Sequence, residues 1–310
     1  MRRVLVTPRS LSRAGHPALD RLSAAGFEIA FCTPGQQPEE DELLRLLPGC
    51  VGYLAGVEKI GARVLGNAVG LKAISRNGTG VDNIDLAAAA RLGIAVLRAE
   101  GANARGVAEL TLAMMLALAR GVSLSDRCMK DGRWQRFEGI ELSGRCLGLV
   151  GCGQIGRLVA EMSLALGMRV LAYDPFVRSE PMRHERFRLA ASLDETLNQA
   201  DVLSLHCPPL PDCRPLLTRE RLAQLKPGAF VVNTSRGELL DDDAVIEALD
   251  TGRLAGVAID AYREEPPGDA PLVRHGRVLA TPHIGAYSKE SVRRAVELAV
   301  DNLLLALRED

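Results

Sequence analysis

Short apolar runs alternate with helix-compatible stretches along almost the whole of this 310-residue chain. The runs are rich in Val, Ile, Leu and Ala, and they lack the polar alternation of a strand with one solvated face. This pattern predicts an α/β protein whose parallel strands are covered by helices on both faces. The expected strands are residues 4–6, 28–31, 51–54, 73–75 and 94–97 in a first series, and 147–150, 170–173, 202–205, 230–232, 257–259 and 278–280 in a second.

Helices between these strands are indicated by their stop signals and their apolar faces. Residues 39–47 are followed by Pro48 and Gly49, which stop a helix. The stretch 104–119 is long and mostly apolar. Residues 289–307 carry apolar side chains at i, i+3 and i+4 spacing, so this last helix requires a surface on which to pack.

The charge balance excludes two classes of partner. Lys and Arg number 38, Asp and Glu number 39, and the formal net charge is −1. Because there is no basic excess, we expect no nucleic acid and no anionic membrane as a partner. The longest apolar run, residues 110–119, has about half of the ~20 residues that a membrane span needs, so no membrane insertion is expected.

Cysteine usage bears on the cellular compartment. The seven cysteines include no Cys-x-x-Cys pair, which argues against a redox motif or a zinc site. The first apolar run ends early, at Thr7-Pro8, too soon for a secretory leader. These features predict a reduced, cytoplasmic protein. No metal site is expected.

A glycine fingerprint, Gly151-x-Gly153-x-x-Gly156, follows one expected strand and precedes a helix. The first glycine permits a tight turn, the second lets the backbone approach a pyrophosphate, and the third allows the helix to pack closely on the strand. The phosphates would then lie at the helix N-terminus, among free N–H groups. This context predicts a dinucleotide site.

Asp174 ends the next expected strand, where a dinucleotide ribose needs an acid. A carboxylate accepts hydrogen bonds from the ribose hydroxyls of NAD and repels the 2′-phosphate of NADP. The flexible side chain of Arg178, four residues later, could soften that exclusion. NAD is therefore the expected cofactor, with NADP as the alternative.

Six motifs follow one another in an order that is found in one enzyme family. They are residues 76–85, 107–109, 151–156, 233–237, 260–266 and 281–285. In this order the chain resembles the D-isomer-specific 2-hydroxyacid dehydrogenases, and most of all their phosphoglycerate dehydrogenase branch. The resemblance runs from about residue 50 to the C-terminus.

The resemblance implies a domain organisation. Two Rossmann-like or flavodoxin-like domains, each with a doubly wound parallel sheet, would enclose an interdomain cleft. Residues 1–100 with 287–310 would form the substrate domain, and residues 101–286 the NAD-binding domain. No regulatory domain is expected. The resemblance also implies a homodimer formed by the NAD-binding domains, with the helix at residues 104–119 at the contact.

Three residues of the motifs have side chains suited to the chemistry of a 2-hydroxy acid. Arg236 offers a planar fork of donors that matches a carboxylate and can polarise the neighbouring carbonyl. His283 can give a proton to the C2 oxygen during reduction and take it during oxidation. Glu265 would hydrogen-bond the other ring nitrogen, fix the tautomer and favour the protonated ring. The resemblance selects Glu265 over the adjacent Glu264 because Glu265 directly precedes proline.

The resemblance also assigns contacts to the cofactor. Gln154 and Ile155 would meet the pyrophosphate and adenosine side, and Asp260 would bind the nicotinamide carboxamide. His206 would line the cofactor and is not expected to act as a catalytic base. The other residues expected to line the cofactor are Cys207, Pro208, Thr234, Ser235 and Gly285.

Contacts to the substrate are expected from the first domain, together with Arg236 and His283. Arg76 stands where the phosphoglycerate branch often carries an arginine that can meet a phosphate, and capping its own loop is the competing role. The residues that would offer backbone groups to the substrate carboxylate are Leu54, Ala55, Gly56, Asn77 and Gly78.

The sequence thus predicts an NAD-dependent oxidoreductase that moves a hydride between nicotinamide and C2 of a small anionic D-2-hydroxy or 2-oxo acid. A substrate like 3-phosphoglycerate is one candidate. Two alternatives stay open: an NADP-dependent glyoxylate or hydroxypyruvate reductase, and a non-catalytic, NADH-sensing scaffold of the corepressor kind. Neither the particular 2-hydroxy acid nor the physiological direction follows from the sequence.

Overall fold

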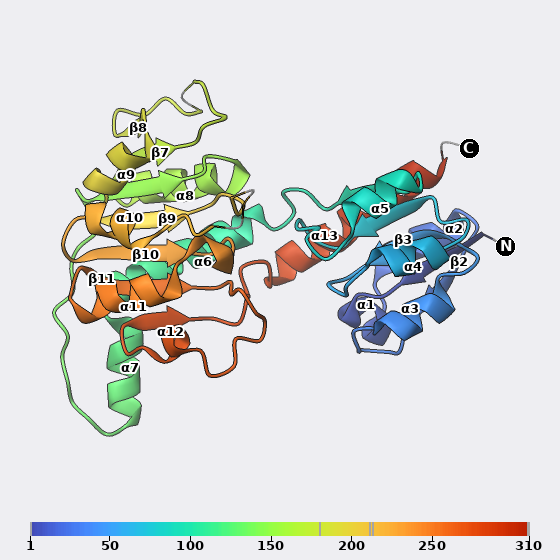
Figure 1. The fold of residues 1–310 in the computed structure, drawn as a ribbon, viewed down its shortest axis with the longest axis horizontal. Coiled ribbons are helices and arrows are strands. Elements are labelled where there is room, and N and C mark those ends of the chain that lie inside the picture. The colour runs from blue at the N-terminus through green and yellow to red at the C-terminus, as the bar shows by residue number, and fades with distance from the viewer. Residues whose placement is uncertain (1, 180, 211, 213, 309–310) are drawn as a thin grey trace. The chain divides into compact units, whose positions relative to one another are not determined.

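The computed structural model describes residues 2–179, 181–210, 212 and 214–308. The chain divides into two compact units (Figure 1). Unit 1 comprises Met1–Asn103 and Lys289–Asp310, and unit 2 comprises Ala104–Ser288. The predicted domain boundaries, at residues 100 and 287, differ from these by only a few positions. Residues 1, 309 and 310 of the predicted substrate domain lie outside the described residues, as does Cys213.

Unit 1 is built on a five-stranded sheet with the strand order β2-β1-β3-β4-β5, in which every pair is parallel. This is the order of the flavodoxin-like folds, in which the chain winds outward from β1 in both directions. The strands are β1 (Arg2–Val6), β2 (Phe27–Phe31), β3 (Cys50–Ala55), β4 (Ala73–Arg76) and β5 (Ala95–Arg98).

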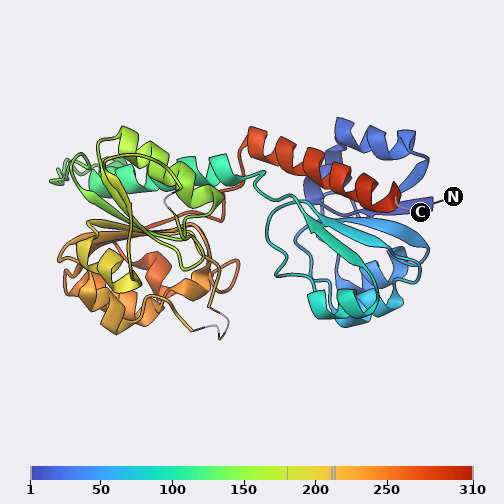
Figure 2. The ribbon, with the colours of Figure 1, turned by 90° about the horizontal axis from the view of Figure 1, so that it is seen from above.

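Helices cover both faces of the unit 1 sheet (Figure 2). The neighbouring residues Val4 and Leu5 of β1 belong to two different buried cores, one on each face. Two-sided burial is the reason that these strands read as continuous apolar runs. The helices of unit 1 are α1 (Arg9–Ala14), η1 (Pro17–Leu19), α2 (Asp20–Ala24), α3 (Glu40–Leu46), α4 (Ala62–Asn67), α5 (Leu86–Arg91) and α13 (Lys289–Arg308).

Helix α13 packs on unit 1, although it follows unit 2 in the sequence. Its apolar stripe, which includes Leu303 and Leu307, is buried against the sheet. Gly52 of β3 lies beneath this stripe, and a Cβ at Gly52 would come within 2.8 Å of Leu307 Cδ1. The glycine therefore makes room for the helix, and the sheet of unit 1 is the packing surface that the stripe requires.

Unit 2 is built on a seven-stranded parallel sheet with the order β12-β11-β10-β9-β6-β7-β8. Its first strand, β6, lies between β9 and β7, so the winding direction reverses there, as in Rossmann folds. The strands are β6 (Cys146–Val150), β7 (Arg169–Tyr173), β8 (Phe187–Leu189), β9 (Val202–Leu205), β10 (Ala229–Asn233), β11 (Leu254–Ile259) and β12 (Val278–Ala280).

Two layers of helices cover the unit 2 sheet (Figure 2). Helices α6 and α8 pack together on one face, and α9, α10, α11 and α12 cover the other, each layer with its own buried core. The helices of unit 2 are α6 (Ala104–Ala119), α7 (Val122–Lys130), α8 (Gln154–Ala165), α9 (Leu193–Gln199), α10 (Arg219–Gln224), η2 (Gly237–Leu239), α11 (Asp242–Asp250) and α12 (Pro271–Arg274).

The predicted fold class, α/β with two doubly wound parallel sheets, is confirmed. Every strand expected from the apolar runs is present, with end residues that shift by a few positions. The edge strand β8 was not predicted, because Phe187–Leu189 is short and Arg188 interrupts its apolar character. The expected long helix coincides with α6, and the last helix with α13.

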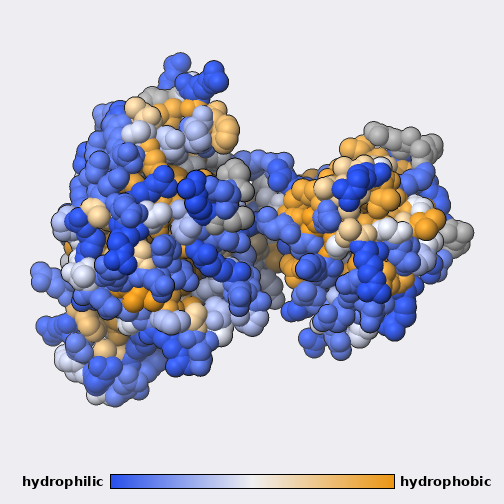
Figure 3. All heavy atoms as spheres, in the orientation of Figure 1, coloured by the Kyte–Doolittle hydropathy of each residue, from blue (hydrophilic) through white to orange (hydrophobic). Residues whose placement is uncertain are grey.

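Apolar side chains are mostly internal, and hydrophilic residues predominate on the face of unit 2 shown in Figure 3. Within the described residues, no single helix is both long enough and apolar enough to cross a membrane. The pair α6 and α7, which is bent by 67° at its break, reaches that length and composition only when the two helices are taken together.

The packing of α13 can be tested with one matched pair of leucines. Leu303 is fully buried, whereas Leu305, two residues later, is 60% exposed. Leu303→Ala is expected to lower the free energy of unfolding by about 3 kcal/mol, because it removes buried methyl groups and leaves a cavity. Leu305→Ala should change it by less than about 0.5 kcal/mol. Urea denaturation measures both, and equal effects would contradict the packing described.

Candidate active site

Most of the predicted site residues follow strand ends on one edge of the unit 2 sheet. The carboxyl ends of parallel strands share an edge, and ligands bind there in folds of this kind. Arg236 follows β10, Glu265 follows β11 and His283 follows β12. Since β10, β11 and β12 are neighbours in the sheet, these three residues start from adjacent strand ends. The glycine loop follows β6 on the same edge.

The three fingerprint glycines have different surroundings. A Cβ on Gly151, whose φ is +94°, would collide with the carbonyl oxygen of His206, and a Cβ on Gly156 would collide with that of Gly151. These two glycines are therefore required by close backbone packing inside unit 2. A Cβ on Gly153 would meet no protein atom within 4 Å. The open side of the loop is thus at Gly153, where a pyrophosphate would have to approach.

Helix α8 begins directly after this open side. Within the described residues no side chain caps its N-terminus, where Gly153 is the N-cap. The first N–H groups of a helix have no acceptor inside the helix, and together with the helix dipole they attract an anion. The amides of Gln154 and Ile155 are at this end. The glycine loop and α8 therefore fit the diphosphate of a dinucleotide.

Asp174 follows β7 and is fixed beside the glycine loop. Its Oδ2 accepts the N–H of Cys152 at 2.8 Å, and its Oδ1 accepts the N–H of Phe176 at 2.9 Å. Each carboxylate oxygen has a second lone pair. The side chain is thus held in place and can still accept hydrogen bonds from ribose hydroxyls.

His206 and Cys207, after β9, are electrically neutral neighbours of the glycine loop. Burial lowers the pKa of His206 to about 4, and its Nε2 lies 2.8 Å from Ser204 Oγ. Burial raises the pKa of Cys207 to about 11. Near neutral pH the imidazole is therefore unprotonated and the thiol keeps its proton. Neither group is poised for acid–base or nucleophilic chemistry, which agrees with a lining role for the segment up to Pro208.

Asn233, the last residue of β10, shapes the loop that carries Arg236. The Asn233 side chain is fully buried; its Nδ2 donates to the Arg236 carbonyl at 2.7 Å and its Oδ1 accepts the Ser235 N–H at 3.1 Å. Arg236 Nη1 donates to the Ser235 carbonyl at 2.9 Å. A Cβ on Gly237 would collide with the backbone of Tyr262. Sequence reasoning gave Asn233 no role, although it opens the Asn-Thr-Ser-Arg-Gly motif.

The hydroxyl groups of Thr234 and Ser235 are used inside unit 2. Thr111 donates to the Val107 carbonyl at 2.8 Å, so the 2.9 Å bond between Thr111 Oγ1 and Thr234 Oγ1 has Thr234 as its donor. Ser235 Oγ donates to the Cys207 carbonyl at 2.6 Å. The hydroxyl protons expected to line the cofactor are therefore already engaged. Any contact with the cofactor falls to the backbone or to the remaining lone pairs.

Glu265 and His283 form a hydrogen-bonded pair. His283 Nδ1 lies 2.7 Å from Glu265 Oε1, which leaves Nε2 as the ring nitrogen that can meet a substrate. The side chains are 45% exposed for His283 and 41% exposed for Glu265. A group that exchanges protons with a substrate needs this access. The pairing favours Glu265 over Glu264 as the orienting carboxylate.

Asp260 holds the loop that carries His283. Only 1% exposed, its carboxylate accepts the Thr281 hydroxyl at 2.6 Å and the N–H groups of Ile284 and Gly285, each at 2.8 Å. His283 itself has a φ of +52°, a left-handed conformation that side chains other than glycine rarely adopt. Sequence reasoning placed Asp260 against the nicotinamide carboxamide. Its carboxylate also accepts three internal donors that shape the histidine loop, and the contact with the nicotinamide stays a prediction.

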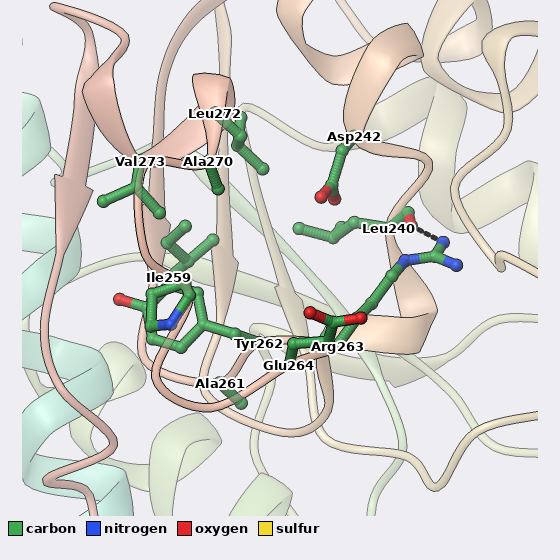
Figure 4. Close-up of a pocket in the computed structure, with 12 residues that line it drawn as sticks. Leu240, Asp242, Ile259, Ala261, Tyr262, Arg263, Glu264, Ala270, Leu272 and Val273 are labelled. Atoms are coloured by element: carbon green, nitrogen blue, oxygen red, sulfur yellow. Dashed lines mark hydrogen bonds between the residues drawn. The ribbon is translucent and has the colours of Figure 1, made fainter.

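A pocket of about 230 Å³ lies beside the Glu265 loop (Figure 4). Tyr262, Arg263 and Glu264 line it, and Arg263 donates to the Leu240 carbonyl. Glu264 lines this pocket, whereas Glu265 and His283 do not. The two adjacent glutamates therefore have different surroundings. In the described part of the chain, no cluster of three or more His, Cys, Asp or Glu side chains could hold a metal ion.

The backbone amides expected to bind the substrate carboxylate in unit 1 are occupied. Gly56 N–H donates to Glu58 Oε1 at 2.9 Å, Asn77 N–H to the Ala55 carbonyl at 2.8 Å, and Gly78 N–H to the Arg76 carbonyl at 2.8 Å. These hydrogen bonds close the loops locally, and the contacts of this segment's backbone groups with the substrate carboxylate stay a prediction.

Glu58 is a functional candidate that sequence reasoning missed. Its side chain is 1% exposed and accepts the N–H of Gly56, the residue that follows β3, at 2.9 Å. It accepts hydrogen bonds from Tyr53 Oη at 2.6 Å and from Thr7 Oγ1. A buried carboxylate is costly unless several donors satisfy it. In the sequence, Val57-Glu58-Lys59 looks like an ordinary solvated stretch, so no local signal marks the residue.

Arg76 folds back over its own loop. Its Nη1 donates to the Asn77 carbonyl at 2.8 Å, and a Cβ on Gly78 would occupy the space of the guanidinium. Gly78 has a φ of +148°. Of the two roles left open for Arg76, this geometry corresponds to capping the loop.

Comparisons with known proteins identify the family of this chain. Residues 112–285 match the NAD-binding domain of the D-isomer-specific 2-hydroxyacid dehydrogenases. The chain belongs to the D-isomer-specific 2-hydroxyacid dehydrogenase family. The D-3-phosphoglycerate dehydrogenase of Methanocaldococcus jannaschii is 39% identical over 252 residues, which are 81% of this chain and 48% of that protein. The predicted family, and the resemblance to its phosphoglycerate dehydrogenase branch, are confirmed.

Solved structures of the family cover the whole chain. The TT0316 protein of Thermus thermophilus is 40% identical, with a TM-score of 0.88 over 99% of this chain and 97% of that one. A D-lactate dehydrogenase from Aquifex aeolicus, complexed with NAD and lactic acid, is 28% identical, with a TM-score of 0.83 over 99% and 96%. By contrast, the chain spans about half the length of the curated relatives it matches.

Gly153 provides a test of the cofactor cradle. Gly153→Ala places a methyl group in open space, so the midpoint of thermal unfolding should stay unchanged. The methyl group lies where a pyrophosphate would approach, and NADH binding should weaken by roughly tenfold or more. Calorimetric titration with NADH measures this. Gly66→Ala, also in open space but in α4 of unit 1, is the matched control, and identical NADH affinities in both variants would refute the cradle.

Proposed function

We propose that this protein is an NAD-dependent dehydrogenase of small anionic D-2-hydroxy acids, working in either direction on the hydroxy acid and 2-oxo acid pair. The observation that carries the proposal is the 2.7 Å contact between His283 Nδ1 and Glu265 Oε1, on the strand edge that also carries Arg236 and the glycine loop. An imidazole with one nitrogen held by a carboxylate and the other free is a proton donor and acceptor.

Each residue of the proposed set has one task. Arg236 binds the substrate carboxylate and stabilises the negative charge that develops on the C2 oxygen. His283 gives its Nε2 proton to that oxygen during reduction and removes it during oxidation. Glu265 keeps the ring in the tautomer and orientation that the transfer needs. In this proposal unit 1 supplies the substrate-binding side. Glu58 supports the unit 1 loop that begins at Gly56.

The cofactor is held by the glycine loop, the N-terminus of α8 and Asp174. When bound, NAD supplies the hydride acceptor for oxidation, and NADH the hydride donor for reduction. The neighbouring surface is lined by His206, Cys207 and Pro208. None of these side chains is charged near neutral pH. The carboxylate of Asp174 favours NAD, because a 2′-phosphate beside it would be repelled.

The substrate is proposed from the relatives. Those in the phosphoglycerate dehydrogenase branch point to a 2-hydroxy acid that carries a phosphate, such as 3-phosphoglycerate. Within the described structure Arg76 is folded over its loop, and a substrate phosphate would have to draw it out. The competing proposals are an NADP-dependent reductase of glyoxylate or hydroxypyruvate and a non-catalytic NADH sensor.

We also propose that the protein is a cytoplasmic homodimer that associates through unit 2. The contact is expected at α6, where Leu116 is 39% exposed. The next helix, α7, and the segment after it also expose large apolar side chains: Val122 is 55% exposed, Met129 54% and Trp134 77%. Apolar groups gathered in this way are typical of an interface between protein chains. Sedimentation at working concentration measures the association state.

The function is tested by an NADH-oxidation screen over glyoxylate, hydroxypyruvate, pyruvate, 2-oxoglutarate and 3-phosphohydroxypyruvate. His283→Ala should lower kcat on the best substrate roughly a hundredfold to ten-thousandfold, because the C2 oxygen loses its proton donor. His184→Ala, at an exposed position outside the site, is the matched control and should keep full activity. NADH binding without turnover on any of these acids would favour the sensor.

The cofactor preference has its own test in Asp174. Asp174→Ala removes both the ribose acceptor and the charge that repels a phosphate, so the ratio of kcat/KM for NADH to that for NADPH should fall by roughly tenfold or more. Asp194→Ala, an exposed aspartate at the start of α9, should leave the ratio unchanged. A native enzyme that already prefers NADPH would overturn this assignment.

A further inference from the structure

Tyr262, in the loop after β11, contacts the loop of His283 through its side chain. The phenol oxygen donates to the Thr281 carbonyl at 2.7 Å. Burial raises the pKa of Tyr262 to about 12, so the phenol keeps its proton at any pH at which such an enzyme is assayed. The same residue packs against the buried core of unit 2 and lines the pocket shown in Figure 4.

The backbone of the same residue contacts Glu265. The Tyr262 N–H donates to Glu265 Oε1 at 3.2 Å, and this oxygen also bonds to His283 Nδ1 at 2.7 Å. The His283 N–H in turn donates to the Thr281 carbonyl at 2.9 Å, the acceptor of the Tyr262 phenol. Four hydrogen bonds therefore close a ring that contains Tyr262, Glu265, His283 and Thr281, which we call the four-bond ring.

The Glu265–His283 pair needs such support. Both side chains are more than two-fifths exposed, and exposed charged pairs contribute little when nothing else fixes them. His283 also has an unfavourable backbone conformation. Asp260 holds the loop from the inside through Thr281, Ile284 and Gly285. The Tyr262 phenol adds a further contact between the loop after β11 and the loop after β12.

We propose that Tyr262 is a positioning residue for the Glu265–His283 pair, acting through the four-bond ring. This inference rests on the proposed function, because the pair has a task only if His283 transfers a proton. The phenol fixes the distance between the two loops, and the tyrosine amide fixes the carboxylate oxygen that faces the imidazole. Proton transfer is sensitive to such geometry, since displacement of a catalytic group by about 1 Å can cost two orders of magnitude in rate.

The test is Tyr262→Phe, which removes one hydroxyl group and keeps the ring in the pocket. The variant should lower kcat roughly tenfold while the KM for NADH stays unchanged, because the cofactor contacts lie elsewhere. Tyr287→Phe, which removes a hydroxyl from an 80% exposed side chain, is the matched control and should match the native enzyme. A Tyr262→Phe enzyme with native kcat would overturn the proposal.

A second readout needs no turnover. The Nδ1–H proton of a histidine bonded to a carboxylate gives a far-downfield proton NMR signal, which is assigned here by its loss in His283→Ala. In Tyr262→Phe this signal should broaden, because a less rigid pair exchanges its proton with water several-fold faster. An unchanged signal would overturn the proposal, even if the native protein turned over no 2-oxo acid. If the native protein turned over no 2-oxo acid, that result would count only against the proposed function.

A double-mutant cycle separates positioning from general damage. In a Glu265→Gln background the pair is already impaired, so adding Tyr262→Phe should lower kcat by less than about twofold. Additive losses would mean that the phenol acts independently of the pair and would overturn the proposal. Thermal unfolding is measured for all four proteins of the cycle. If their stabilities are equal, a smaller loss of kcat from Tyr262→Phe in the Glu265→Gln background than in the native background supports positioning.

Discussion

The buried carboxylate of Asp260 is the interaction on which the geometry of this site depends. One side chain at the end of β11 satisfies three donors from the loop after β12, and so joins two neighbouring strand ends. A buried charge with this many donors is stable, whereas the same charge without them would be costly. The left-handed conformation of His283 can persist because the residues on either side of it are held.

Close backbone packing is the second constraint on the structure. It shows at positions where any residue larger than glycine would collide with neighbouring backbone. Gly151 and Gly156 allow β6, α8 and the end of β9 to meet, while Gly237 lets the Arg236 loop pass the Tyr262 backbone. Of these four glycines, Gly153 alone faces open space. Three of these four glycines thus serve the protein's own packing, and the fourth leaves open space beside the loop. Glycines in such motifs are therefore required for two different physical reasons.

Much of the fold and part of the site follow from the sequence alone. Two-sided burial makes the strands readable as apolar runs, and the strand ends place Arg236, Glu265 and His283 on one edge. Hydrogen bonds between distant loops are not readable in this way. Asn233, Glu58 and the Tyr262 phenol act through partners that only the fold brings near. The local acceptors of the Gly56, Asn77 and Gly78 amides are equally unreadable, because a motif does not show which N–H groups are already used within a loop.

The placement of α13 has a consequence for how the polypeptide matures. Unit 2 interrupts unit 1, so a ribosome releases nearly two hundred residues between the sheet of β1 to β5 and the helix that covers it. Until then the face around Val4 and Leu54 lacks the helix that completes its cover, and its apolar side chains must be shielded from other nascent chains. Chaperone demand should therefore concentrate on the segment of β1 to β5, and it should fall when α13 docks.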